Sequence, residues 1–125
     1  MSNSADDILN SLKGGLEANL PKRSGDAKTH ETGAASITFV LTGGCQHSFP
    51  YTYLRSSRHT KEGITVKTGD AIITIKGSHL ESIYSFIRRQ KISEIALSQK
   101  HEKTDQQAFV EFISIHYIDE EITYE

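Results

Sequence analysis

Residues 63–97 contain the clearest structural pattern of the chain, and it limits what the remaining residues can form. In order, this stretch predicts two adjoining strands, a helix and a third strand. Apolar residues alternate with polar ones over residues 64–68, which predicts a strand with one buried face. Residues 71–77 are mostly apolar and β-branched, which predicts a more central strand. Between them Gly69-Asp70 predicts a type II′ hairpin turn, so the two strands are expected to pair antiparallel.

The helix of this stretch is predicted over about residues 78–90. Ser78 and Glu81 have the spacing of a capping box, in which the two side chains satisfy backbone N–H groups of the first turn. Arg88 and Arg89 stand at the carboxyl end, where cations suit the helix dipole. Four residues at helical spacing predict one apolar stripe: Leu80, Ile83, Tyr84 and Ile87.

Further strands are predicted on both sides of the helix. Residues 49–53 alternate as a strand does, but Pro50 has no N–H to donate. They therefore predict an edge strand, or an extended entry followed by one helical turn. Residues 56–62 are polar and basic, and they predict a loop. The other predicted strands are residues 36–42, 92–97 and 109–118, the last with apolar residues on both sides.

This order of elements predicts an α+β domain. We expect a small, twisted antiparallel sheet or a partly open barrel of about 5–6 strands, with one packed helix. SH3-like and Sm-like small barrels have this general size, a comparison that rests on architecture alone and assigns no residues. The predicted domain covers residues 36–118, after a short amphipathic helix at 1–17 and a flexible linker at 18–35, and an acidic tail follows at 119–125.

The N-terminal helix has an apolar stripe interrupted by Gly14-Gly15. A helix this short is marginal in water unless it docks on something. Two interpretations are open: a frayed or loosely docked helix, or a helix that binds a second subunit or a partner's groove. The stripe consists of Ile8, Leu9, Leu12 and Leu16.

Charge is distributed unevenly along the chain, although the formal net charge is only −2. Residues 36–100 contain nine Lys and Arg against four acids, whereas residues 101–125 contain one base against seven acids. The acidic end either neutralises the basic body, within one fold or across a subunit interface, or guards a surface meant for a phosphate backbone or an acidic partner.

Little in the sequence predicts enzyme chemistry. Cys45 and His47 are half of a metal-site pattern, but zinc sites use about four ligands and no second pair is present. Cys45 has no orienting or oxyanion motif beside it that would indicate a nucleophile. We therefore expect no catalytic residues, no metal and no cofactor.

One cysteine excludes an intrachain disulfide. The chain shows no signal-peptide pattern and no apolar run long enough to span a bilayer. These features predict a cytoplasmic protein with no membrane partner.

The most credible binding surface in the sequence combines aromatic residues with bases. In nucleic-acid-binding barrels such residues stack on bases and neutralise phosphates, although alternating aromatics in a strand are more often core. The candidate residues are Tyr51, Tyr53, Arg55, Arg58 and Lys61, with Arg88 and Arg89 at the end of the predicted helix.

The first functional hypothesis is a non-enzymatic protein-interaction or oligomerisation module, binding a protein partner or a second copy of itself. This hypothesis uses the basic body, the acidic tail and the N-terminal helix. Edge strands offer a further route: if the Pro50 strand or the late strand at 109–118 is unpaired, it could add to another subunit's sheet. The alternative is a small nucleic-acid-binding barrel that uses residues 49–61.

Overall fold

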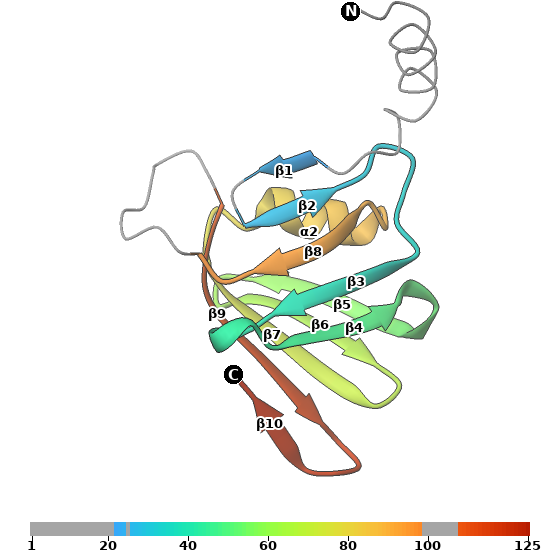
Figure 1. Cartoon of the computed structure of the whole chain (residues 1–125), viewed down its shortest axis with the longest axis vertical. Coiled ribbons are helices and arrows are strands. Elements are labelled where there is room, and N and C mark those ends of the chain that lie inside the picture. Colours follow the sequence, from blue (N-terminus) through green and yellow to red (C-terminus); the bar gives the residue numbers. More distant parts are fainter. Residues whose placement is uncertain (1–21, 25, 99–107) are drawn as a thin grey trace, which may run out of the picture.

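The computed structural model describes residues 22–24, 26–98 and 108–125, which form two five-stranded sheets and one α-helix (Figure 1). The first sheet has the order β1 (Lys22–Ser24), β2 (Ala27–Thr29), β8 (Ile92–Ala96), β3 (Ser36–Val40) and β4 (Gln46–Pro50). The second sheet has the order β10 (Ile122–Tyr124), β9 (Phe109–Tyr117), β7 (Ala71–Ser78), β6 (Gly63–Thr68) and β5 (Leu54–Thr60). The helix is α2 (Glu81–Arg88), and two short 3₁₀ turns are η2 (Thr42–Gly44) and η3 (Tyr51–Tyr53).

The predicted α+β class is confirmed in its coarse form, because the protein is mostly β with a single α-helix among the described residues. A closed or partly closed barrel is not formed: the strands make two separate sheets, each with two edges. The predicted all-antiparallel pairing is also wrong at one place. β3 and β8 run parallel, with Phe39 opposite Ile95, because α2 carries the chain across from the second sheet to the first.

Both sheets contribute side chains to one core. The inward positions of β6 and β7, and those of β9 from Ile113 onward, alternate with outward ones, which buries residues such as Ile64, Ile73 and Ile115 with no exposed surface. From the first sheet, Phe39 and Phe49 meet edge to face, with their ring centroids 6.1 Å apart. Alternation in both sheets thus produces a two-layer sandwich with a single apolar interior.

The helix closes one side of this sandwich. It lies behind the first sheet in Figure 1 and packs against β5 and β8. The predicted stripe is confirmed, since Leu80, Ile83 and Ile87 are buried. The hydroxyl of Tyr84 donates a hydrogen bond to the Ser57 carbonyl on β5 at 3.3 Å, so the helix also covers part of that edge strand.

The start of the helix differs from the prediction. Ser78 is the last residue of β7, where it pairs with Phe109, and the helix begins only at Glu81. Leu80 occupies the N-cap position, and the helix has no side-chain cap. The capping box is therefore wrong, because pairing with β9 holds Ser78 in the sheet.

The turn between β6 and β7 is present but is not type II′. Gly69 does not adopt the positive φ that a type II′ turn requires at its first central position. Instead the Thr68 hydroxyl accepts hydrogen bonds from the backbone N–H groups of Asp70 and Ala71, at 3.3 and 3.0 Å. The buried side chain of Thr68 therefore stabilises this turn, which does not need a glycine with positive φ.

Two segments expected to lack regular structure form strands, and so does part of the acidic tail. The predicted loop at 56–62 is mostly β5, whose polar residues suit an edge strand with one face in solvent. Within the predicted linker, β1 and β2 join the first sheet, and Ala27 is buried in the core. Within the predicted acidic tail, β10 pairs with β9. The predicted helix at 1–17 lies outside the described residues.

The strand at 109–118 is confirmed as β9, but the idea that it is an unpaired edge is wrong. It pairs with β7 on one side and with β10 on the other. The strand containing Pro50 is an edge, since β4 ends the first sheet, and η3 follows it directly. Both alternatives for residues 49–53 thus describe part of what is observed.

We expect Gly77→Ala to lower the free energy of unfolding by about 1–3 kcal/mol. Gly77 lies at a bulge where β7 meets β9, and a Cβ there would overlap the backbone carbonyl of Phe109. Urea unfolding followed by circular dichroism measures the loss. The matched control is Gly69→Ala, whose Cβ would meet only the Arg55 side chain at 3.7 Å. We expect that variant to change stability by less than about 0.5 kcal/mol. Equal effects at the two positions would contradict the steric argument.

We expect Tyr51→Phe to destabilise the protein by about 1–3 kcal/mol at neutral pH, because the buried Tyr51 hydroxyl donates to the Ile92 carbonyl of β8. Burial also raises the pKa of Tyr51 above its ordinary value. In the unfolded chain the phenol ionises near pH 10, so its contribution is fully present below that pH and is lost as pH rises further.

The measurement is the difference in unfolding free energy between the protein and Tyr51→Phe. It should stay constant from about pH 7 to 9 and shrink above about pH 10. Tyr53→Phe, which changes an exposed phenol, serves as the control and should leave stability unchanged at every pH. A difference that grows above pH 10 would reverse the sign and reject this account.

Candidate functional site

The edge of the second sheet farthest from α2 borders an open side of the sandwich. Here β10 ends the second sheet and β4 ends the first, so two edge strands lie at the same side of the molecule. Three rings fill the space between them. His47 Nδ1 and Tyr117 Oη share a hydrogen bond of 2.8 Å, and the rings of His47 and Tyr124 have centroids 4.8 Å apart. We call this region the open side and define it by His47, Tyr117, Ile118, Ile122 and Tyr124.

Apolar surface is exposed on the open side. In Figure 1 the β9–β10 hairpin projects from the bottom of the molecule, beyond the first sheet. Ile118, Ile122 and Tyr124 are 45%, 43% and 40% exposed, and they belong to the four large apolar residues that are exposed in the described part of the chain. Register explains why: Ile122 and Tyr124 lie opposite Tyr117 and Ile115, so they continue the inward face of β9 past the first sheet.

The electrostatics of the open side are acidic. Asp119, Glu120 and Glu121 form the turn between β9 and β10, and Glu125 follows β10. Partial burial raises the pKa of the Tyr117 hydroxyl, and the nearby Asp70, Tyr124 and Glu120 raise it further. Tyr117 therefore remains a neutral hydrogen-bonding partner for His47 across the usual pH range.

A second surface lies on the opposite side of the second sheet, which no described element covers. Residues that alternate with the buried positions of β5, β6, β7 and β9 point away from the core. We call this the outer face and define it by Ser56, Arg58, Thr65, Lys67, Ile72, Thr74, Lys76, Phe112, Ser114 and His116. Its charged groups are all cations.

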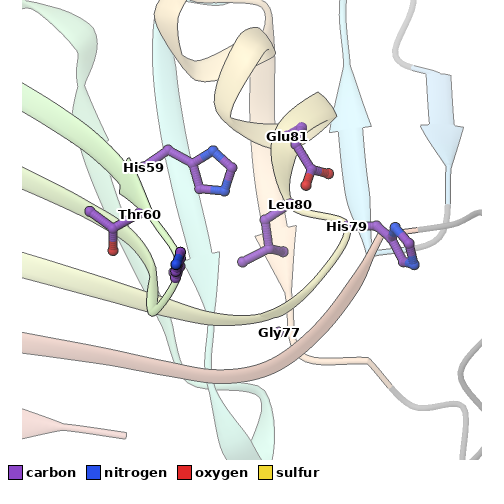
Figure 2. Close-up of a pocket in the computed structure, with 8 residues that line it drawn as sticks. His59, Thr60, Gly77, His79, Leu80 and Glu81 are labelled. Atoms are coloured by element: carbon purple, nitrogen blue, oxygen red, sulfur yellow. The ribbon is translucent and has the colours of Figure 1, made fainter.

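A cleft of about 460 Å³ lies between the β5–β6 hairpin and the start of α2 (Figure 2). His59, Lys61 and Glu81 contribute polar groups to it, and Figure 2 shows His79 lying apart from His59, on the far side of Leu80. The His59 ring instead rests near the Tyr84 ring, with centroids 5.4 Å apart. The two imidazoles therefore do not converge as a pair of ligands or as an acid and a base.

Neither metal binding nor thiol chemistry gains support from the geometry. Among the described residues, no three His, Cys, Asp or Glu side chains are grouped so that they could hold a metal ion. Cys45 is exposed in the turn before β4, while the His47 ring is engaged with Tyr117. Proximity in sequence thus does not bring this thiol and this imidazole together as a catalytic pair.

The aromatic and basic residues that the sequence singled out do not form one surface. Tyr51 is in the core, whereas Tyr53 is 57% exposed in η3. Arg58 lies on the outer face, and Lys61 lies in the β5–β6 turn at the cleft. Arg55 is exposed where the pairing of β5 with β6 is irregular, and its guanidinium lies beside Gly69.

The two helix arginines are separate from all of these positions. Arg88 and Arg89 are exposed at the end of α2, where Arg89 stacks over the Phe86 ring at 4.9 Å. Residues 8–16 of the candidate interaction helix lie outside the described part of the chain. The sequence reading missed Lys67 and Lys76, although the alternation of β6 and β7 was a usable signal, since it places both on the face opposite the buried isoleucines.

Within the part of the chain that the structure describes, no helix has the length and apolar character needed to cross a bilayer. Comparison of the chain with protein families, with curated proteins and with solved structures gives no match. Function is therefore inferred from the open side and the outer face themselves.

Proposed function

We propose that this protein is a non-enzymatic interaction module that associates with a second copy of itself through the open side. The observation that carries the proposal is the exposed apolar surface of Ile118, Ile122 and Tyr124 on a projecting hairpin. Large apolar side chains scattered singly over a surface need no explanation, but three on one hairpin beside two open edges favour an interface.

Backbone groups support the same proposal. An edge strand presents unpaired N–H and C=O groups, and a second chain that pairs with them gains main-chain hydrogen bonds. On the other side of the sandwich, α2 and the hydrogen bond of Tyr84 to Ser57 cover part of the β5 edge. β4 and β10 have no such cover among the described residues, so association is more favourable at the open side.

Charge indicates which arrangement is favoured. If β10 paired antiparallel with its own copy about Thr123, Glu121 of one copy would face Glu125 of the other, and like charges directly opposite are destabilising. β4 carries no Asp, Glu, Lys or Arg. A symmetric arrangement in which β10 of each copy lies against β4 of the other keeps these carboxylates from standing directly opposite each other and still buries Ile122 and Tyr124.

We expect the full-length chain to be a dimer by size exclusion with light scattering, and Ile122→Ser/Tyr124→Ser to be a monomer. Both side chains are partly exposed, so the variant should fold normally, which circular dichroism checks. Raising the salt from about 0.1 to 1 M shortens the Debye length from about 10 to 3 Å and screens the acidic turns. Dimerisation should therefore strengthen with salt.

Two matched variants sharpen this test. Tyr53→Ser removes a more exposed aromatic ring from η3 and should remain dimeric. Leu12→Ser/Leu16→Ser removes half of the predicted N-terminal stripe. Loss of the dimer in that variant, with Ile122→Ser/Tyr124→Ser still dimeric, would assign association to the N-terminal segment. A monomer under all conditions would reject self-association altogether.

A further inference from the structure

The outer face of the second sheet carries a regular pattern of hydroxyls and cations that the proposed self-association does not use. Strand pairing arranges it in rows that cross the sheet, about 5 Å between strands and about 7 Å between rows. The middle row contains Arg58, Thr65, Thr74 and Ser114. A neighbouring row contains Ser56, Lys67, Ile72 and His116, and on the other side Lys76 lies opposite Phe112.

Three cations surround the threonines of the middle row. Arg58, Lys67 and Lys76 are all exposed and come from three different strands. On this face β5, β6 and β7 present no carboxylate, because Glu62 and Asp70 stand in the turns at the strand ends. Arg58 and Lys67 are thus exposed cations with no carboxylate beside them on these three strands, and a bound anion would supply the missing charge.

One part of the face is hollowed to receive such an anion. A depression of about 130 Å³ is lined by Ser56, Ser57, Arg58, Thr65 and Lys67. The guanidinium of Arg58 offers a planar fork of N–H donors, Lys67 adds a point charge, and the hydroxyls add further donors. Side chains of these types make most protein contacts to phosphate oxygens.

Apolar groups continue the surface beside the hollow. Ile72 is half-buried in the row of Lys67, and Phe112 is half-buried next to Lys76, whose Nζ lies 5.6 Å from the ring centroid. A flat sheet face with cations for the backbone and an aromatic ring near them is the form in which many proteins bind single strands. With one ring on the face, most of the affinity would come from phosphate contacts.

From these features we infer that the outer face binds the phosphodiester backbone of single-stranded nucleic acid, with Arg58 and Lys67 holding one phosphate in the hollow. Thr65 and Thr74 donate hydrogen bonds to the next part of the backbone, and Lys76 contacts a further phosphate. This site differs from the aromatic and basic surface that the sequence predicted, since it replaces Tyr51 and Lys61 by residues of β6 and β7. It does not depend on the open side.

The experiment measures fluorescence anisotropy of labelled oligo(dT) and oligo(U), each against a duplex of the same length, at several salt concentrations. For single strands the logarithm of affinity falls by about 0.7 per neutralised phosphate for each decade of salt. Two neutralised phosphates, one held by Arg58 with Lys67 and one by Lys76, predict a slope near −1.4, so affinity should drop about sevenfold from 50 to 200 mM salt. Arg58→Gln/Lys67→Gln should weaken binding and reduce the slope to about −0.7.

The matched control removes the same charge elsewhere. Arg88→Gln/Arg89→Gln, at the end of α2, should keep the slope near −1.4 and the affinity within about threefold. Thr65→Val/Thr74→Val keeps strand propensity and charge, so it should weaken binding several-fold without changing the slope. These variants differ from those of the open side. Salt weakens nucleic-acid binding but strengthens dimerisation. Either proposal can therefore be rejected while the other stands.

Three results would overturn the inference. The first is no binding of either oligonucleotide at 50 mM salt. The second is an equal loss in Arg58→Gln/Lys67→Gln and Arg88→Gln/Arg89→Gln, which would show a general charge effect. The third is equally tight binding of polyglutamate, which would assign the outer face to an acidic polypeptide. A clear preference between oligo(dT) and oligo(U), with the salt slope retained, would support the inference and show whether the outer face prefers DNA or RNA.

Discussion

The antiparallel pairing of β7 with both of its neighbours is the constraint on which the rest of this structure depends. β7 lies between β6 and β9, and Ile73 and Ile75 point into the core while Thr74 and Lys76 point out. Because side chains alternate with a period of two, a slip of one residue would exchange these faces. The same register therefore forms the apolar interior of the sandwich and the polar, cationic outer face.

Two sheets that pack face to face without closing into a barrel leave two open sides. This protein covers the apolar interior differently at each of them. On one side α2 covers the interior with its apolar stripe and partly covers the β5 edge through Tyr84. On the other side, among the described residues, a cluster of rings around His47 lies between β4 and β10, and the hairpin extends beyond it. This asymmetry is the physical basis for placing an interface at the open side.

The unequal charge along the chain becomes a separation in space. Bases of β5, β6 and β7 gather on the outer face, and the acids that follow β9 surround β10 at the far edge of the same sheet. The acids around β10 and the cations of the outer face thus occupy different places on one sheet. Salt acts on the two surfaces in opposite directions, because it screens repulsion at one and attraction at the other.

The sequence by itself determined the elements whose signal is local: the strands at 63–68, 71–78, 92–96 and 109–117, and the apolar stripe of α2. It failed at the described part of 18–35 and at the start of the helix, since β2 pairs with β8 and Ser78 pairs with Phe109, partners that are distant in sequence. It also failed at 56–62, where β5 is a polar edge strand with one face in solvent. For the candidate sites it named Arg58 but grouped it with Tyr51, which the core buries. Only the tertiary structure decided that Arg58 lies beside Lys67 and that Ile122 and Tyr124 stay uncovered, because pairing register and the packing of one sheet on another are not local properties of the chain.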